Sequence, residues 1–243
     1  MSALILFGLA VMLLAAYVWH AREHVYPLLN LALFKVRTFR VGVGGGFITR
    51  LGIGALPFLL PLLYQLGLGF PAWQSGLLMM PSALAAMGMK MIATKVLARF
   101  GYRRILTINT VMIGCTIACF SLVDTTTPIA LIVMLGFTMG FFNSLQFTCM
   151  NSMAYADIKT PDASMASTIA SSLQQLSMSF GLAFGLLITG WFLAGLPQTN
   201  HVAVLSALHR AFICMGAITI ISALTFTTLR VNDGENVSRA HSS

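Results

Sequence analysis

The sequence has 243 residues, of which 58% are hydrophobic and only 8% are charged. A soluble domain carries roughly 25% charged residues, so this chain has too little polar surface to coat a water-soluble globule, and lipid must be its main solvent. The net charge of +8 does not indicate nucleic-acid binding, because the basic residues lie between apolar runs and no RNA- or DNA-binding module is visible.

Seven apolar segments are long enough to cross a bilayer as helices, which takes about 20 residues each. The connections between them are short, so neighbouring helices are expected to run antiparallel, and the longer ones are expected to tilt. The predicted fold is therefore all-α and integral to the membrane. The predicted spans cover residues 2–19, 41–66, 73–98, 104–123, 128–150, 165–194 and 206–229.

The first apolar segment has no basic region ahead of it and no small-residue cleavage site, so we interpret it as a span and not as a signal peptide. The apolar stretch that follows, Val25 to Phe34, is too short to cross and is expected to lie along the membrane interface. These features predict an extra helix with a cytoplasmic interfacial linker over 1–38, a six-helix bundle over 39–230 and a flexible cytoplasmic tail over 231–243.

The distribution of Lys and Arg predicts the orientation of the spans, because connections rich in these residues stay on the cytoplasmic side. The opposite connections hold neither residue until Arg210. We therefore expect the C-terminus in the cytoplasm and the N-terminus outside. The basic connections and the tail carry Arg22, Lys35, Arg37, Arg40, Arg99, Arg103, Arg104, Lys159, Arg230 and Arg239.

Met1 opens directly onto a span that would begin outside the cell. Seven spans in this orientation are also the layout of heptahelical receptors and retinal proteins, but the last span has no Lys to form a retinal Schiff base. The simpler interpretation is that the sequence is the C-terminal portion of a larger transporter, either as a truncated reading frame or as a piece of a longer chain.

Arg50 is the main candidate for function. It lies ten residues past Arg40, or about 15 Å into the membrane, where burying an Arg costs at least about 2.5–3.5 kcal/mol. We therefore expect it to face the bundle interior, either paired or in contact with water. The structural alternative is that its guanidinium bonds polar side chains or the backbone carbonyls freed by Pro57 and Pro61.

The acidic residues all lie in connections or in the tail, so Arg50 has no counter-ion within any predicted span. Its expected partners are water, amides such as Asn143 or Gln146, an anionic cargo, or a carboxylate outside this chain. Proton coupling needs a group whose pKa burial can move, and the spans offer only Arg50 and Lys90, of which Lys90 can extend toward the interface. The six acids are Glu23, Asp124, Asp157, Asp162, Asp233 and Glu235.

Two later spans combine amides with small residues. Asn143 and Gln146 are three residues apart and share a helix face, where neutral amides can bond varied substrates or neighbouring helices. In the next span, small residues recur every four positions, which favours close packing or sliding against a partner bundle over a ligand site. The residues that form this seam are Ser167, Ser171, Gly181 and Gly185.

Enzymatic function has no support in the sequence. No nucleophile–base pair, phosphate-binding loop or metal-ligand cluster is visible, and the four Cys all lie in apolar runs, where they are interpreted as packing groups. We expect no metal and no cofactor.

Four stretches resemble a known family. They are "YPLLNLALFKVRTFR" (26–40), "LPFLLPLLYQLGLGFPAWQSGLLMMPSA" (56–83), "ATKVLARFGYRR" (93–104) and "NSMAYADIKTPDASMASTIASSLQQLSMSFGLAFG" (151–185). All four are similar to segments of the fourteen-span major facilitator drug:proton antiporters of the EmrB/QacA type. The resemblance implies that this chain holds one extra helix and the C-terminal six-helix bundle, built from two inverted three-helix repeats over 41–123 and 128–229.

The resemblance also implies a function. The first helix of each repeat would line a central cavity, the second would face the other half, and the third would pack outside. The whole protein would export drugs or other small molecules across a bacterial inner membrane by proton antiport with alternating access, with the missing N-terminal half as its partner. The residues expected along the substrate pathway are Arg50, Asn143, Gln146, Asn151 and Gln174.

Gly101, Arg103 and Arg104 match the end of the family's cytoplasmic loop motif, whose basic residues help to lock the cytoplasmic side. The motif's usual acid and opening glycine are replaced by Ala98 and Thr94, so anchoring to anionic lipid headgroups explains the arginines equally well. Two alternatives remain open: a stand-alone seven-helix receptor or assembly factor, and the same fold carrying a metabolite or an organic anion.

Overall fold

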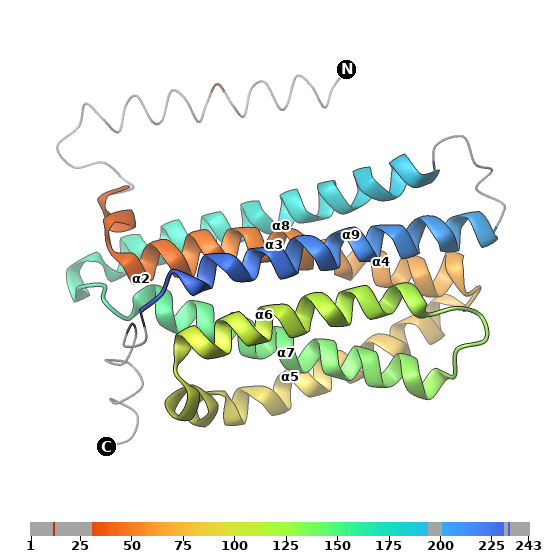
Figure 1. Ribbon diagram of the computed structural model, residues 1–243, viewed down its shortest axis with the longest axis horizontal. Helices are drawn as coiled ribbons and strands as arrows, with labels where there is room; N and C mark the ends of the chain where they lie inside the picture. The colour runs from red at the N-terminus through yellow and green to blue at the C-terminus, as the bar shows by residue number, and fades with distance from the viewer. Residues whose placement is uncertain (1–11, 13–30, 194–200, 231–232, 234–243) are drawn as a thin grey trace.

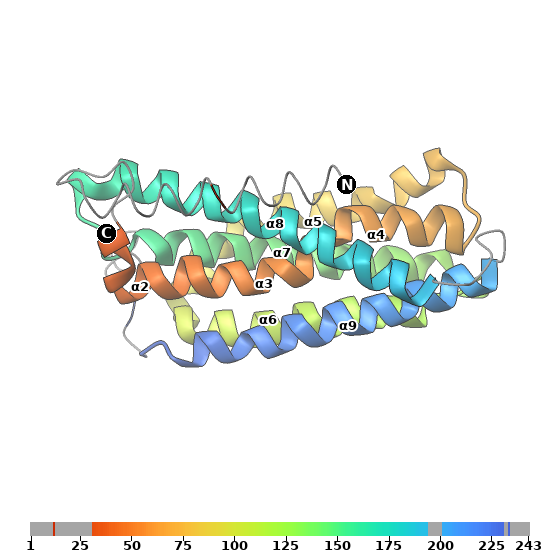
Figure 2. The same cartoon turned by 90° about the horizontal axis from the view of Figure 1, so that it is seen from above.

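The computed structural model describes residues 12, 31–193, 201–230 and 233. The predicted span over 2–19, most of the linker and most of the tail lie outside these residues, so the three-part division of the chain stays a prediction. The described part contains helices and no strand, and its long helices run side by side in an elongated bundle, as the two views in Figure 1 and Figure 2 show.

Six helical segments of the described part are long and apolar enough to cross a membrane, which confirms the predicted spans after the first. Their ends lie within five residues of the predicted limits. The first begins earlier than predicted, at Arg37, because long basic side chains can continue a helix into the interface. The spans are Arg37–Gly67, Ala72–Leu97, Tyr102–Leu122, Ile129–Tyr155, Thr160–Leu193 and Val202–Thr227.

The first span is broken into short pieces. Pro57 is the second residue of α4 and has no N–H for the carbonyl of Ile53, so the helix restarts with Phe58 and Leu59 donating to the Ala55 carbonyl at 3.1 and 2.9 Å. The break lies about one turn beyond Arg50. After the 3-10 turn η1 (Leu31–Lys35), the pieces are α2 (Arg37–Phe39), the π-helical turn η2 (Arg40–Gly45), α3 (Gly46–Ile53), α4 (Leu56–Leu62) and η3 (Leu63–Gly67).

The remaining spans are long helices, and helices of one predicted repeat pack on helices of the other. Most contacts of α5 are with α7. The helix α8 packs mainly on the first span, above all on α3, and α6 packs on α9. The second helix of each predicted repeat thus packs on the first helix of the other repeat, as two inverted repeats require. The elements are α5 (Ala72–Phe100), α6 (Tyr102–Cys119), η4 (Phe120–Leu122), α7 (Ile129–Tyr155), η5 (Thr160–Asp162), α8 (Ala163–Leu193) and α9 (His201–Thr227).

Each of these three helix pairs crosses at a glycine. A Cβ on Gly140 of α7 would lie 2.0 Å from the Ser82 carbonyl oxygen of α5, and one on Gly181 of α8 would lie 2.7 Å from the Leu51 carbonyl oxygen of α3. Gly114 of α6 lies equally close to the backbone of α9. Hydrogen alone fits at these positions, and the backbones can therefore approach closely.

Burial and charge are unevenly distributed over the bundle. Within the 18-residue apolar stretch of each span, only 22% is buried in α5 and in α8, against 61% in the first span and 50% in α6. The second helices of the two repeats therefore have the largest uncovered faces.

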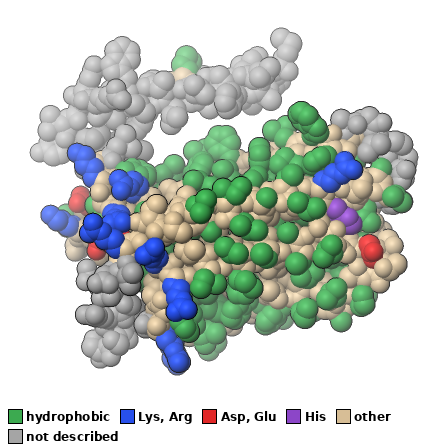
Figure 3. All heavy atoms as spheres, viewed as in Figure 1, with side chains coloured by type: hydrophobic (Ala, Val, Ile, Leu, Met, Phe, Trp, Pro, Cys, Tyr) green, Lys and Arg blue, Asp and Glu red, His purple; other side chains and the backbone are tan. Residues whose placement is uncertain are grey.

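The basic residues are separated from the rest of the surface. Figure 3 shows that the Lys and Arg side chains gather at one end of the molecule, apart from one group at the other end. This is the spatial separation that the connections predicted.

Candidate functional site

Arg50 lies near the middle of the first span, in α3, thirteen residues after Arg37. Its side chain is only 4% exposed. Within the described part of the chain no hydrogen bond or ion pair reaches it, and its Nε is a buried donor without a partner.

The guanidinium of Arg50 instead stacks on an aromatic ring. Its Cζ lies 5.0 Å from the ring centre of Phe147 on α7. A desolvated cation–π contact contributes about 2 kcal/mol, which offsets only part of the cost of burying a guanidinium in the membrane. Offsetting the rest of this free-energy cost requires a further hydrogen-bond or ion-pair partner for the guanidinium, and the described residues do not supply one.

Gly46 makes the space for this guanidinium. A Cβ at Gly46 would lie 2.6 Å from Nη1 of Arg50 and 3.3 Å from Sδ of Met150. The side chain therefore runs back toward the basic end of the bundle and away from Pro57 and Pro61. Bonding to the carbonyls that these prolines free, the structural alternative from the sequence, is not what the structure shows.

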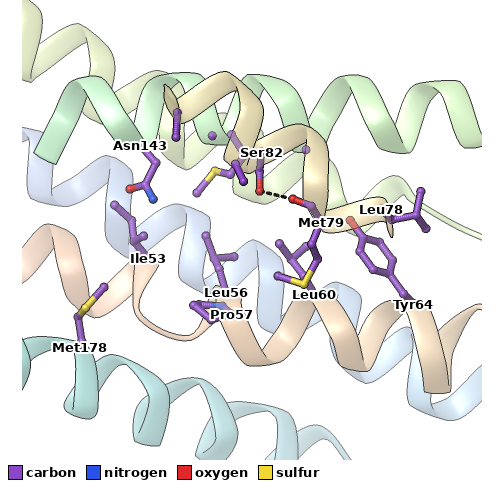
Figure 4. Close-up of a pocket in the computed structure, with 15 residues that line it drawn as sticks. Ile53, Leu56, Pro57, Leu60, Tyr64, Leu78, Met79, Ser82, Asn143 and Met178 are labelled. Carbon is purple, nitrogen blue, oxygen red and sulfur yellow. Dashed lines mark hydrogen bonds between the residues drawn. The ribbon is translucent and has the colours of Figure 1, made fainter. Parts of the chain in front are cut away.

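A cavity of about 250 Å³ lies between α4, α5 and α7, about one turn beyond Arg50. Its wall is mostly apolar, and Figure 4 shows Asn143 reaching into it from α7 toward Ile53. Ser82 uses its hydroxyl to donate to the Met79 carbonyl at 2.7 Å, whereas Oδ1 of Asn143 is buried without a partner. Labelled lining residues in Figure 4 include Ile53, Tyr64, Met79, Ser82, Asn143 and Met178.

The chemistry of this cavity suits an apolar guest that makes few polar contacts. Methionine side chains adapt to different shapes, and the one free amide oxygen can accept at most two hydrogen bonds. Pockets for drug-sized ligands span about 300–1,000 Å³. At about 250 Å³ this cavity holds only part of such a molecule, as expected of a site that another surface completes.

Gln146, predicted to share the substrate pathway with Asn143, is instead used inside the bundle. It is fully buried, its Oε1 accepts from Nδ2 of Asn109 at 2.8 Å, and its Nε2 donates to Oγ1 of Thr110 at 2.7 Å. Asn109 also donates to the Phe142 carbonyl at 2.8 Å. These bonds fasten α6 to α7, and Gln146 does not line the cavity.

The other candidates lie apart from the cavity. Asn151 is exposed near the end of α7. Gln174 is half-buried on α8, and its backbone carbonyl accepts a hydrogen bond from the Ser177 hydroxyl at 2.8 Å. The small-residue seam is divided in two. Ser167 and Ser171 are exposed, whereas Gly181 and Gly185 pack against the first span of the same chain.

The residues of the loop motif lie at the basic end of the bundle. Gly101 joins α5 to α6 with φ of +73°, a left-handed conformation that glycine adopts without strain. The side chains of Arg103 and Arg104 are exposed at the start of α6. Lys90 is exposed on α5, consistent with a side chain that extends from the helix surface.

Sequence reasoning missed the partners that define these sites. Phe147 is one of 17 phenylalanines and carries no signal of its own. Asn109 and Thr110 are adjacent polar residues within the predicted span 104–123, and this pair was a usable signal, because polar side chains inside a membrane helix require partners.

The sequence is similar to a family of membrane transport proteins. Residues 1–182 match the family model described as "Major Facilitator Superfamily". The chain is 36% identical to the "Putative multidrug resistance protein MdtD" of Serratia proteamaculans (strain 568) over 235 residues, which are 97% of this chain and 49% of the relative. The proteins of the same name from Yersinia enterocolitica and Klebsiella pneumoniae (strain 342) are also 36% identical over 97% of this chain and 50% of their own lengths.

The family model and these relatives confirm the resemblance to the major facilitator family that the four stretches indicated. The chain spans about half the length of the relatives it matches. Together with six apolar helices packed as inverted repeats, the match over most of the sequence shows that this multi-pass membrane protein belongs to the major facilitator superfamily.

Proposed function

We propose that this chain is the C-terminal half of a secondary active transporter that exports drugs or other small molecules from a bacterium by alternating access. The single observation that carries the proposal is the incomplete apolar cavity beside Asn143. The same bundle buries Arg50, whose guanidinium points away from the cavity and has no counter-ion among the described residues. Relatives named as multidrug resistance proteins, about twice as long as this chain, support the same assignment.

The uncovered helix faces support a missing partner. Both α5 and α8 leave most of their surface unburied, and the exposed face of α8 carries polar side chains that gain little from contact with lipid. They include Ser167, Ser171, Ser172 and Gln175. A second six-helix half, placed against α5 and α8 and closing the cavity, would cover these faces and allow one half to rock against the other.

Proton antiport is the proposed energy source, with the coupling carboxylates in the other half. A proton carrier needs a pKa near the working pH. Asp124 accepts hydrogen bonds from the side chain and the backbone N–H of Thr126 and from the side chain of Thr127, which hold the pKa of Asp124 below its ordinary value. Asp124 is therefore a turn-forming carboxylate and unsuited to carry protons.

A second candidate cargo is an organic anion, which Arg50 favours because a carboxylate or phosphate would be its counter-ion. The orientation that fits the proposal places the basic end of the bundle in the cytoplasm and the C-terminus with it, in a bacterial inner membrane, since Lys and Arg mark the cytoplasmic side. The stand-alone seven-helix alternative has no comparable observation in its favour.

Substituting the two amides separately tests the cavity assignment. In the full-length transporter, Asn143→Leu is expected to raise the dye concentration for half-maximal ΔpH-driven uptake into inverted vesicles several-fold without lowering the melting temperature. Gln146→Leu should instead lower the melting temperature, because Asn109 and Thr110 lose their partner at about 1–2 kcal/mol. Fluorescent-dye uptake and thermal unfolding measure the two effects.

The control for both variants is the amount of transporter inserted in the vesicles, measured by immunoblot. Equal effects of the two substitutions on the dye concentration for half-maximal uptake would contradict the placement of Asn143 in the binding cavity. Absence of ΔpH-dependent uptake by the unmodified transporter, for a panel of lipophilic dyes, would contradict the proposed drug antiport itself.

A further inference from the structure

A groove on the side of the bundle runs from exposed arginines along apolar side chains of α6 and α7. Its volume is about 260 Å³, and Arg104 and Phe100 lie at one end of it. A second hollow of about 480 Å³ adjoins it at the turn between α5 and α6. Phe100, Arg104 and Ile108 line both hollows, which therefore form one continuous surface.

The arginines at this surface have no counter-ion among the residues that the structure describes. Arg103 and Arg104 are exposed, and no ion pair joins either of them to another described residue. Nearby, Arg99 stacks its guanidinium over Phe100, 5.8 Å from the ring centre. Arg103 and Arg104 both line the second hollow, and two guanidinium groups on one hollow favour a phosphate, whose oxygens match their paired donors.

The groove itself suits a hydrocarbon chain. Ile108 and Met112 are 52% and 41% exposed on α6, and Phe142 and Leu145 of α7 form the facing wall. The amide donors of Asn109, also in the lining, are already used by the protein. From Arg104 to Met112 the helix rises about 12 Å, so the apolar wall leads from the interface into the hydrocarbon region.

The position of the groove keeps it accessible to lipid in the assembled transporter. It lies on α6, the third helix of its repeat, which packs on α9, whereas α5 and α8 present the uncovered faces proposed for the other half. The turn between α5 and α6, which carries these arginines, lies at the same end of the bundle as α2 (Figure 1), and the basic side chains gather at that end (Figure 3). This end faces the anionic leaflet under the positive-inside rule.

We propose that this groove binds one anionic phospholipid, with its phosphate on Arg103 and Arg104 and an acyl chain lying along Ile108, Met112 and Phe142. The arginines supply charge recognition and the apolar wall supplies the remaining contact area. This lipid site is independent of the cargo, since neither Arg103 nor Arg104 lines the cavity beside Asn143.

Native mass spectrometry of the delipidated transporter tests the proposal by titration with phosphatidylglycerol and with phosphatidylcholine of identical chains. The first phosphatidylglycerol is expected to bind at least tenfold more tightly than phosphatidylcholine. The double variant Arg103→Gln/Arg104→Gln should weaken phosphatidylglycerol binding about 30-fold, because each basic residue near the surface contributes about a factor of five.

Two further variants separate this site from general attraction to a basic surface. Lys159→Gln/Arg230→Gln removes the same charge from exposed positions in the loop before α8 and after α9 and should change the affinity less than threefold. Ile108→Trp fills the groove and should weaken binding with the arginines intact. Equal binding of both lipids, or equal losses in the two double variants, would overturn the proposal, and melting temperatures confirm that each variant is folded.

Discussion

Replacing Arg50 with Gln is expected to reduce transport by the full-length protein at least tenfold, or to change its cargo range, while membrane insertion and folding stay intact. Insertion is retained because the substitution removes a buried charge that costs at least about 2.5–3.5 kcal/mol. No ion pair reaches Arg50 among the described residues, so we expect its charge partner to be the cargo or the other half. Removing one member of such a buried charge pair costs about 2–5 kcal/mol, and transport is therefore lost.

Companion variants identify the partner of Arg50. Arg50→Lys keeps the charge but loses the planar contact with Phe147 and should retain partial activity. Lys90→Gln removes an exposed basic residue from another span and should have little effect. If the partner of Arg50 is an anionic cargo, Arg50→Gln should raise KM for anionic cargo alone. If the partner is a carboxylate of the other half, a second substitution that neutralises that carboxylate should restore transport by Arg50→Gln. Unchanged transport by Arg50→Gln would assign Arg50 a structural role.

Gly140→Ala is expected to destabilise the bundle strongly, because its Cβ would lie 2.0 Å from the Ser82 carbonyl oxygen and 2.6 Å from two further backbone atoms of Ser82. No side-chain rotation relieves a clash with backbone, so α5 and α7 must separate. Overpacking of this kind costs about 1–3 kcal/mol and occasionally more. The apparent melting temperature in detergent and the yield of monodisperse protein measure the effect.

Gly136→Ala is the matched control for this prediction. Gly136 lies one turn before Gly140 on the same face of α7, and its nearest neighbour to a Cβ is the Leu78 carbonyl oxygen at an ordinary 3.5 Å. Alanine has a higher helix propensity than glycine, by about 1 kcal/mol, so this variant should be as stable as the unmodified protein or more stable. Equal melting temperatures for the two variants would contradict the close crossing of α5 and α7.

The spans were predictable because each consists of about 20 or more apolar residues that end at basic or turn-forming residues. The rotation of each helix was not. Asn143 and Gln146 point about 60° apart around α7, which is enough for one amide to enter the cavity and the other to meet Asn109 on α6. Spacing along a single helix shows a shared side but cannot show which neighbour each side chain meets.

The packing of the small-residue seam of α8 was also only partly predictable from its spacing. Each of its two pairs has the same four-residue spacing, yet Gly181 and Gly185 pack on the first span while Ser167 and Ser171 are exposed. Packed helices cross at an angle and diverge on both sides of the crossing point. A regular row of small residues therefore predicts a crossing but cannot define its extent.

Arg50 was more predictable. Its burial was expected from the cost of placing an Arg deep in the membrane, and its lack of a counter-ion within the spans was expected from the positions of the acids. Its contact with Phe147 and the room provided by Gly46 depended on the packing of α3 against α7. The cavity likewise exists only where three helices meet at the break near Pro57. The sequence therefore indicated which residue was unusual, and the packing showed what surrounds it.

The central claim, that this chain is one half of a two-part transporter, is tested most directly by ΔpH-driven dye uptake into inverted vesicles that contain this chain, the preceding half, or both. We expect uptake only when both halves are present, and we expect Arg50→Gln in this chain to remove it again. Uptake by vesicles that contain this chain alone, at a rate matching the two halves together, would contradict the claim.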